Sequence, residues 1–500
     1  MGDGPLRLAL RLPDEISEET GDSVVRVNGQ IARMLRSAFE VVAPAEADLE
    51  VWAVLAPEPH AGAPRLLMCH GALGDPGHWL RSVPKLRVGD TLAAHSRTDL
   101  DLIARLGGTP FCGVELLPLF VDTSCFVPLG ADRDRLRARF GLPPRVPLLL
   151  SAGRVYDEKN VHGALHLLAA LHRAGARAHL AVAGDGPAAY RAYLEQLSER
   201  LAVRGFVHFV GAQGVAALNE LYNAADLLVH LSLVRKENFG LVPLEAQAAG
   251  LPVLSSHWGG LRDLVRPGQT GFYARTWLVR GERRVDWAGL VEPCLDLLRD
   301  APRRAAFGRQ ARAHVEAEYA PAPFRARLLA LLDRWAASPP SAAALARRVA
   351  LSEAAKEMVF IYALVGREHP EAEDSFAISR LLQREQHGTF AYRAIHACMA
   401  TSAEPPELPE PDDRGPLYRL VDFESAAAGR RVILEPPWDR SVALGEAAAW
   451  LLAYLQEGPA ALPALRDAAR GNGLAEPELT LAVRELLDEG LVGVAGPPTQ

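Results

Sequence analysis

The sequence is poor in cysteine and has no long apolar run. Its 500 residues contain five cysteines, which are odd in number, widely spaced and never in a Cys-x-x-Cys pair. They indicate neither a disulfide framework nor a zinc site. No run of about 18 uninterrupted apolar residues occurs, and residues 1–13 lack a basic start, an apolar centre and a cleavage site. We therefore expect a soluble, cytoplasmic protein.

The charge balance has no strong bias toward either sign. The chain has 61 Asp and Glu against 54 Lys and Arg, a formal net charge of −7, so nothing global favours nucleic acid or an anionic membrane. Hydrophobic residues make up 49% and charged residues 23%, values that exclude wholesale disorder. At about 150 residues per domain, the length predicts about three domains.

Short apolar runs alternate with helical patterns through the first two thirds of the chain. Such alternation predicts parallel βαβ units with helices on both faces of each sheet. We expect two Rossmann-like domains in series, residues 1–145 and 146–336, with a ligand cleft between them at the carboxyl ends of the strands. The expected strands of the second domain are Pro147–Ser151, His179–Ala183, Val207–Val210, Asp226–Leu231 and Val253–Ser255.

The pattern changes after a proline-containing boundary at residues 337–341. Residues 341–403 look helical, and the proline-rich, acidic stretch 404–416 is typical of a linker. Residues 417–500 end in three predicted helices and a short strand, which suggests a winged-helix-like module. From 441 to 500 there are three basic and eight acidic residues, a balance unsuited to reading DNA. A peptide or protein contact, or simple packing, fits this module better.

The most informative motif is a pair of glutamates, Glu237 and Glu245, on either side of a predicted helix start. The loop before that helix would present the backbone amides of Phe239, Gly240 and Leu241 at the positive helix end, which suits a diphosphate. Glycine at position 240 would allow close approach of the main chain.

This segment resembles the E-x7-E motif of the GT4-like retaining glycosyltransferases of the GT-B fold, also called glycosyl transferase group 1. Gly153-Arg154 followed by Lys159 resembles the G-R-x4-K loop of that family, and Ala183–Pro187 resembles its G-x-G-P turn. The resemblance is strong over residues 147–335, weaker over 1–146 and absent over 341–500. It implies a GT-B architecture with an acceptor domain followed by a nucleotide-sugar donor domain.

The resemblance also implies roles for individual residues. Arg154 and Lys159 would neutralise the donor diphosphate and the charge that develops on it, an electrostatic form of catalysis. Glu245 would bind the two ribose hydroxyls. Glu237 would hold sugar hydroxyls and steady an oxocarbenium-like transition state, and His70 would face the donor sugar and the acceptor. The remaining implied site residues are Gly184, Gly186 and Asn238 at the donor, Gly211 beside the base, and Gly21 and Asp22 in an acceptor or phosphate loop.

No metal is predicted. Asp99-x-Asp101 and Asp132-x-Asp134 spell the D-x-D motif of a different glycosyltransferase fold, but helix N-terminal charges explain both pairs better. Trp258, His257 and Asn238 are candidates for shaping sugar selectivity.

The function that we expect is transfer of a sugar, with retention, from a nucleoside diphosphate sugar to an acceptor hydroxyl or similar nucleophile. The acceptor could be a glycan, a lipid, a natural product or a peptide, and the donor is a co-substrate rather than a cofactor. Two alternatives stay open: a non-catalytic scaffold or sensor that binds a peptide or protein partner through its C-terminal module, and a nucleotide-sugar epimerase. Simpler interpretations also stay open, with the glutamates and cations on the surface and His70 in the core.

Overall fold

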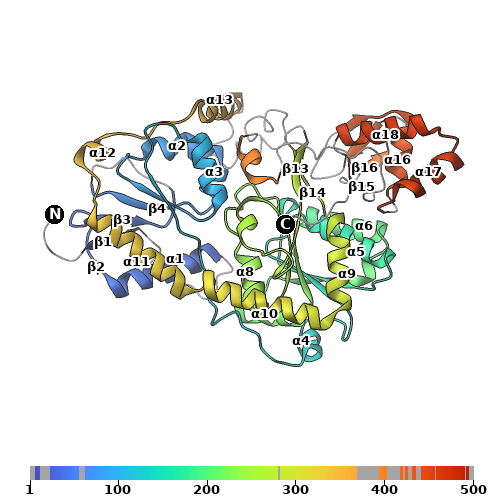
Figure 1. The fold of residues 1–500 in the computed structure, drawn as a ribbon, viewed down its shortest axis with the longest axis horizontal. Helices are drawn as coiled ribbons and strands as arrows, with labels where there is room; N and C mark the ends of the chain where they lie inside the picture. Colours follow the sequence, from blue (N-terminus) through green and yellow to red (C-terminus); the bar gives the residue numbers. More distant parts are fainter. Residues whose placement is uncertain are drawn as a thin grey trace.

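The protein consists of two α/β lobes and a C-terminal extension (Figure 1). The structure is a computed structural model, which describes residues 6–11, 23–55, 62–279, 282–368, 394–401, 417–419, 423–425, 431–434, 441–456, 458–489 and 491–494. Each lobe contains one six-stranded parallel sheet. The alternation of strands and helices in the sequence therefore produces the two Rossmann-like lobes that it predicts.

The first lobe has the strand order β2-β1-β3-β4-β5-β6, and all of its strands pair in parallel. Strand β4 is buried at every position, as expected for a sheet covered on both faces. The elements of this lobe are β1 (Arg7–Arg11), α1 (Ser23–Ala38), β2 (Glu40–Val41), β3 (Leu49–Trp52), β4 (Arg65–Met68), η1 (Ala72–Gly74), α2 (Pro76–Arg81), η2 (Val83–Lys85), β5 (Thr91–Ala94), α3 (Arg97–Leu106) and β6 (Gly113–Leu116).

The second lobe has the order β12-β11-β10-β7-β8-β9, again in parallel. An antiparallel hairpin, β13–β14, follows the sheet. The elements up to that point are α4 (Arg133–Arg139), β7 (Leu148–Ala152), η3 (Asp157–Lys159), α5 (Val161–Arg173), β8 (His179–Ala183), α6 (Ala188–Arg200), η4 (Arg204–Phe206), β9 (Val207–Gly211), α7 (Val215–Ala224), β10 (Leu227–His230), α8 (Leu241–Ala248), β11 (Val253–Ser256), η5 (Gly259–Asp263), β12 (Gly271–Ala274), β13 (Thr276–Val279) and β14 (Glu282–Val285).

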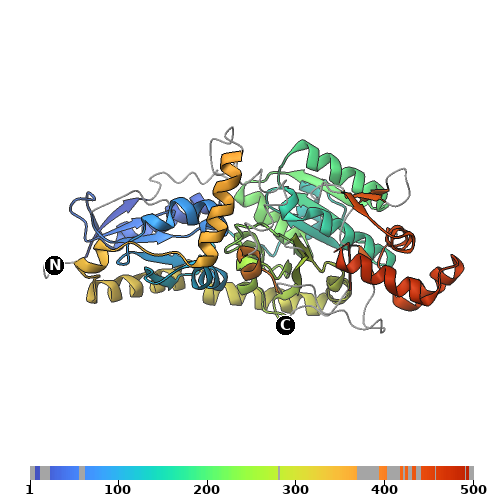
Figure 2. The same ribbon diagram turned by 90° about the horizontal axis from the view of Figure 1, so that it is seen from above.

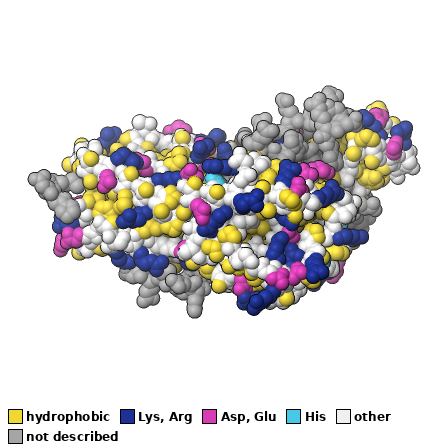
Figure 3. Space-filling view, turned by 60° about the horizontal axis from the view of Figure 1, so that its bottom comes forward, with side chains coloured by type: hydrophobic (Ala, Val, Ile, Leu, Met, Phe, Trp, Pro, Cys, Tyr) yellow, Lys and Arg dark blue, Asp and Glu magenta, His cyan; other side chains and the backbone are white. Residues whose placement is uncertain are grey.

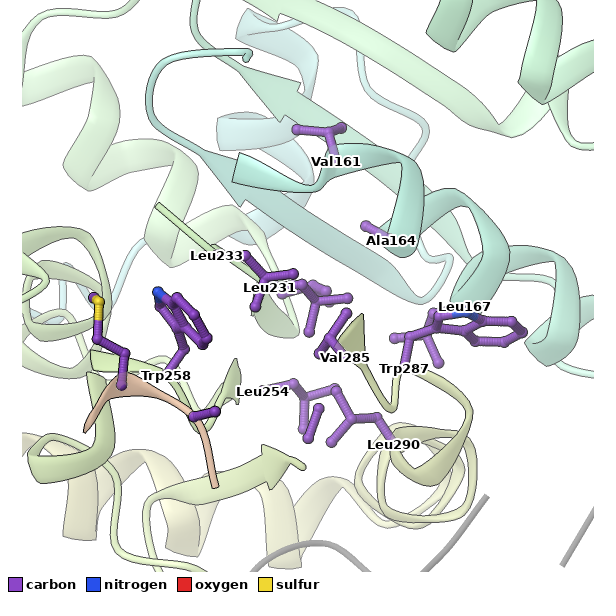
Figure 4. Packing of buried hydrophobic residues seen from close by; sticks show 14 of the residues in the cluster. Val161, Ala164, Leu167, Leu231, Leu233, Leu254, Trp258, Val285, Trp287 and Leu290 are labelled. Atoms are coloured by element: carbon purple, nitrogen blue, oxygen red, sulfur yellow. The ribbon is translucent and has the colours of Figure 1, made fainter. Parts of the chain in front are cut away.

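The five predicted strands of this lobe are all present, within one residue at each end, and His179–Ala183 coincides with β8. The sequence did not predict β12, which adds a sixth strand at the sheet edge beside β11. Both lobes bury continuous apolar clusters. Part of one is shown in Figure 4, where side chains from α5, the β10 end and the β14 end pack together.

The chain returns to the first lobe after the second sheet. Helices η6 (Ala288–Leu290), α9 (Val291–Arg299) and α10 (Ala301–Glu318) stay with the second lobe, whereas α11 (Pro321–Ala337) runs beneath the first (Figures 1 and 2). Arg334 of α11 lies 2.8 Å from Glu115 of β6, and the Phe324 ring lies 4.6 Å from that of Phe120. Helix α11 therefore packs on the first lobe, and the chain connects the two lobes a second time between α10 and α11.

The extension continues along both lobes. Helix α12 (Ala342–Ala346) and residues 347–352 hydrogen-bond to the edge of the first lobe, and α13 (Glu353–Glu368) packs on α2 and α3. Residues 394–401 lie instead against the second lobe, where Thr401 exchanges hydrogen bonds with Thr276 at 3.0 Å. The predicted helix Phe376–Cys398 falls outside the described residues up to position 393, and 394–399 are helical.

The C-terminal residues bury an apolar cluster of their own. The three predicted helices and the terminal strand are present, together with four short strands that the sequence did not predict. These elements are β15 (Leu417–Arg419), β16 (Phe423–Ser425), β17 (Arg431–Leu434), β18 (Ser441–Ala443), α16 (Glu446–Tyr454), α17 (Leu462–Gly471), α18 (Glu476–Asp488) and β19 (Val492–Val494).

Within the described residues, no helix is both long enough and apolar enough to cross a membrane. On the face shown in Figure 3, Lys and Arg side chains are interspersed with Asp, Glu and apolar side chains among the residues that are coloured. That face therefore offers no broad surface of one charge.

Candidate active site

The loops at the carboxyl ends of β7 and β10 bring two predicted site residues into direct contact. Lys159 ends η3, and Glu237 lies in the loop between β10 and α8. The Lys159 Nζ atom lies 2.6 Å from Oε2 of Glu237, and the Ser232 hydroxyl donates to the same oxygen at 2.5 Å. The carboxyl ends of parallel strands lie at one edge of a sheet, which is why residues 78 positions apart form this pair.

Glu237 remains ionised although its side chain is only 10% exposed. Burial by itself would raise its pKa, but Lys159 and the hydrogen bond from Ser232 bring the pKa down to about 2. Nearby His230 has its pKa lowered to about 4, first by burial and then by Lys159. At neutral pH the site therefore contains a carboxylate and a neutral imidazole.

Glu245 lies one helical turn inside α8 and is held from both lobes. The Arg26 guanidinium, on α1 of the first lobe, lies 3.1 Å from Oε1 of Glu245, while the hydroxyl of Tyr222 donates to Oε2 at 3.0 Å. Glu245 is 3% exposed, and burial raises its pKa even though Arg26 and Tyr222 oppose that shift. Each carboxylate oxygen of Glu245 thus accepts one hydrogen bond, and Oε1 accepts it from the first lobe.

A cavity of about 690 Å³ opens between the lobes beside Glu245. Its walls come from α1, from residues 120–126 of the first lobe, and from the start of α7 and α8 in the second. This volume lies within the range of small-molecule sites. The cavity combines Arg26 and Arg33 with apolar groups such as Leu241 and Phe126, so it can accept a ligand that has both charged and flat apolar parts.

Helix α8 begins immediately beside this cavity. Gly240 is its N-cap with φ 101°, and no side chain caps the helix. A Cβ at position 240 would overlap the Leu261 side chain, so only glycine fits. The Phe239 side chain is buried 5.8 Å from the Tyr319 ring, so Phe239 can serve a ligand only through its backbone. No side chain caps the amides that begin α8, and a helix start of this kind can bind an anion.

The turn after β8 has no room for side chains at its two glycines. A Cβ on Gly184 would overlap the carbonyl oxygen of Gly153, and one on Gly186 would overlap that of Val155. Gly184 also has φ 142° and donates its amide to the Gly211 carbonyl at 2.8 Å. The predicted glycines 184 and 186 are therefore required for the β7 and β8 loops to approach each other, with Gly211 beside them.

His70 follows β4 and approaches the same region from the first lobe. It has φ 35°, and its Nε2 lies 2.9 Å from the Asn28 side-chain oxygen. Its ring lies 4.7 Å from that of His95, and its pKa is lowered well below 6.5, first by burial and then by His95. His70 is thus a neutral hydrogen-bonding group at pH 7, and its buried Nδ1 has no hydrogen-bond partner among the described residues.

Direct contacts join the two lobes at the cleft. Lys236 Nζ lies 2.6 Å from Asp75 Oδ2, and the Asn238 amide lies 3.4 Å from Asp99 Oδ2. A Cβ on Gly71 would overlap the backbone of Lys236, so the loop after β4 rests on the residue before Glu237. The first lobe therefore reaches the E-x7-E loop directly.

Other predicted site residues have different surroundings. Arg154 is exposed in the loop after β7, with its guanidinium 5.7 Å from the Tyr156 ring. Gly21 and Asp22 lie outside the described residues. Trp258 is 0% exposed and donates to the Val234 carbonyl at 2.9 Å, so the expectation that it shapes sugar selectivity is wrong. The residue is part of the core.

The D-x-D pairs are explained by helix starts, as the sequence predicts. Asp99 lies in the first turn of α3, and Asp132 is the N-cap of α4, accepting a hydrogen bond from the Asp134 amide at 3.0 Å. Among the described residues, no group of three or more His, Cys, Asp or Glu side chains could hold a metal ion.

Sequence reasoning missed several polar neighbours of the site: Arg26, Asn28, His95, Tyr222, His230 and Ser232. These residues have no motif of their own. His230 could have been noticed, because it ends a wholly apolar strand. Arg26 is one of several arginines on an amphipathic helix, and nothing in its local sequence sets it apart.

Two parallel-sheet lobes that face each other across such a cleft define the class: this is a GT-B fold. A solved structure with the same fold is Anabaena HepE in complex with UDP and glucose. The match covers 66% of this chain and 100% of that one, with a TM-score of 0.52 and 17% sequence identity. At that identity the likeness concerns the fold alone.

Residues 132–314 match the family model of glycosyl transferases group 1, which confirms the resemblance seen in the sequence over the part of the chain that forms most of the second lobe. The D-inositol 3-phosphate glycosyltransferase of Rhodococcus opacus is 32% identical over 233 residues, 45% of this chain and 49% of the relative. That of Xylanimonas cellulosilytica is 36% identical over 231 residues, 45% and 52% of the two chains. The chain spans about half the length of these curated relatives.

Proposed function

We propose that the protein is a retaining glycosyltransferase that moves a sugar from a nucleoside diphosphate sugar to an acceptor nucleophile. The observation that supports this most is the buried Lys159–Glu237 pair, which lies beside the uncapped start of α8 and eight residues from Glu245 in the cavity. A cation, a row of free amides and two carboxylates are the groups that a diphosphate flanked by two sugar rings requires.

The proposed reaction uses charge rather than a covalent intermediate. The α8 amides, Lys159 and exposed Arg154 hold the diphosphate and stabilise the negative charge that grows on it as the glycosidic bond breaks. Glu237, ionised even in acid, stabilises the positive charge that develops on the sugar. The acceptor oxygen bonds to the anomeric carbon on the face that the diphosphate leaves, and its proton passes to the departing phosphate oxygen. We propose that no metal is required.

Glu245 is the proposed partner of the donor ribose. Its two oxygens already accept from Arg26 and Tyr222, which shows that they can bind two donors at once. A ribose diol likewise offers two hydroxyl donors, and a carboxylate has acceptor sites for both. His70, neutral at pH 7, can hydrogen-bond either to the donor sugar or to the acceptor.

The test is to incubate the purified protein with UDP-, GDP- and ADP-sugars and to measure nucleotide release, and then to determine the anomeric configuration of any product. Glu237→Gln should retain the fold yet lose at least 100-fold in turnover. The function is rejected if wild-type protein neither binds nor consumes any of these nucleotides. A product with inverted configuration would overturn retention alone.

A scaffold or sensor and a nucleotide-sugar epimerase are distinguished in the same experiment. A scaffold would bind nucleotides without releasing sugar, and an epimerase would return a changed nucleotide sugar without an acceptor. The ion-paired Glu237 and Lys159 favour catalysis over simple binding, because an anion and a cation side by side can stabilise both charges that develop as the glycosidic bond breaks.

A peptide or protein partner of the C-terminal module is a separate proposal. Strands β16 and β18 are the terminal strands of the sheet β16-β17-β18, and such strands can pair with an added strand. Deleting residues 404–500 should abolish partner capture while donor hydrolysis persists. Equal capture by the truncated protein would contradict this proposal.

A further inference from the structure

A second ion-pair network lies directly behind Lys159 and Glu237. Glu158, the residue before Lys159, receives a hydrogen bond from Arg283 at 2.9 Å between Nη1 and Oε1. Arg235 lies 3.4 Å from the same carboxylate oxygen. The Glu158 side chain is 24% exposed and that of Arg283 is 21% exposed, so the pair is mostly enclosed. Burial would raise the pKa of Glu158, but the two arginines lower it.

Arg283 connects the two loops that carry the reactive pair. Its Nη1 donates not only to Glu158 in η3 but also to the carbonyl of Leu233, in the loop that leads to Glu237. The amide of Leu233 in turn donates to the Glu158 carbonyl at 2.8 Å. One guanidinium thus fixes the spacing between the loop of Lys159 and the loop of Glu237.

Arg283 is well placed for this task because its strand is anchored in the core. It lies on β14, and Figure 4 shows two residues just beyond it in the apolar cluster, Val285 near Leu231 and Trp287 beside Leu167 of α5. Val285 is 6% exposed and Trp287 is 4% exposed. The end of β14 that follows Arg283 is therefore anchored in the core, which suits a side chain that must hold two loops at a fixed spacing.

We propose that Arg283, acting with Glu158, is a positioning residue for sugar transfer: it sets the distance between Lys159 and Glu237 from behind, without touching the substrate. The inference rests on the proposed function. A displacement of about 1 Å in a reacting group can cost about 100-fold in rate. Loss of Arg283 should thus impair the chemical step more than it impairs donor binding, because the α8 amides, Arg154 and Glu245 still hold the donor when Lys159 is displaced.

The test compares Glu158→Gln, Arg283→Met and Arg283→Lys with a matched control, Glu195→Gln. Glu195 pairs with Arg191 at 2.9 Å on the surface of α6, so the control removes the same kind of charge away from the cleft. We expect Glu158→Gln and Arg283→Met to lower kcat at least tenfold while donor KM changes less than threefold. Arg283→Lys should recover part of kcat, and the control should match wild type.

The pH profile separates positioning from a general loss of folded protein. Lys159 on η3 and His230 at the end of β10 are the ionisable groups that face Glu237. If Arg283→Met lets Lys159 move away, the pKa of Glu237 rises. The loss of kcat on the acid side of the pH profile should then begin at least one pH unit higher than in wild type. A lower fraction of folded protein would reduce kcat at every pH without moving that limb.

Amide hydrogen exchange supplies a readout that needs no activity. In Arg283→Met, and to a smaller extent in Glu158→Gln, exchange should accelerate at residues 157–160 and 233–238 and remain unchanged in the first lobe. If these segments exchange as in wild type, or if kcat and its pH profile are unchanged in an active enzyme, the inference is wrong. If wild type neither binds nor consumes a nucleotide sugar, the proposed function fails instead. Hydrogen exchange then still shows whether Arg283 holds the loops of Lys159 and Glu237 together.

Discussion

Replacing Lys159 with methionine should destabilise the second lobe by an amount that the structure allows us to estimate. The pKa of Glu237 falls from 4.5 to about 2 in the folded protein. That difference corresponds to about 3 kcal/mol at neutral pH, since each pKa unit is worth about 1.4 kcal/mol. The shift is a net one in which Lys159, His230 and the hydrogen bond from Ser232 together outweigh burial, so removal of Lys159 should cost an amount of this order.

The expected unfolding temperature follows from that energy. For a lobe of about 150–250 residues, 1 kcal/mol shifts Tm by roughly 2–4 °C, so Lys159→Met should lower the Tm of the second lobe by roughly 6–12 °C at pH 7. The double variant Lys159→Met/Glu237→Gln should be more stable than Lys159→Met, because it no longer leaves a buried carboxylate without its cation.

The pH dependence has a definite sign. Because the folded pKa of Glu237 lies below the unfolded value, the stabilisation is complete above about pH 4.5 and is lost as the pH falls toward 2. Calorimetry of wild type, both single variants and the double variant between pH 3 and pH 8 measures this. The reasoning is refuted if Lys159→Met melts with wild type at pH 7, or if the double variant is less stable than Lys159→Met.

Three further predictions concern other parts of the cleft. Gly184→Ala should abolish nucleotide binding in titration calorimetry and lower Tm, because its Cβ would overlap the Gly153 carbonyl; unchanged binding would contradict the tight turn. Tyr222→Phe should weaken nucleoside diphosphate binding about tenfold, since one oxygen of Glu245 loses its donor; equal affinity would show that this hydrogen bond is not needed. Asp99 has its pKa raised to about 7, chiefly by burial, so the folded protein binds the extra proton and stability falls as the pH rises from about 4 to 7. Asp99→Asn should therefore be more stable than wild type at pH 7 and equal to it at pH 4, and a constant difference across that range in urea titrations would refute this.

Local sequence patterns predicted most of the two sheets. Strands such as β8 are continuous apolar runs because both faces are buried, and this leaves a mark in the sequence that does not depend on the partner strand. Strand β12 escaped notice because it is short and its first residue is the Gly271 of a turn motif. The strands of the C-terminal module also escaped notice because each has only three or four residues.

Motifs predicted the glycines of the turn after β8 and the start of α8, because those residues are constrained locally. Gly184 and Gly240 are set by the backbone itself, which has φ values that L side chains rarely adopt and no room for a Cβ. The Trp258 prediction failed because a large aromatic residue beside a motif carries no information on which way its side chain points. In the folded protein its indole is buried and bonded to Val234.

The sequence by itself therefore determined the alternation of strands and helices, the glycine turns and the identity of the family domain. Only the tertiary structure decided which charges meet: Arg26 with Glu245 across 219 positions, and Arg283 with Glu158 across 125. A backbone conformation is selected by the few residues around it. The partners of an ion pair are set by how whole lobes and hairpins pack. The local sequence around one arginine does not distinguish it from the many others in the chain.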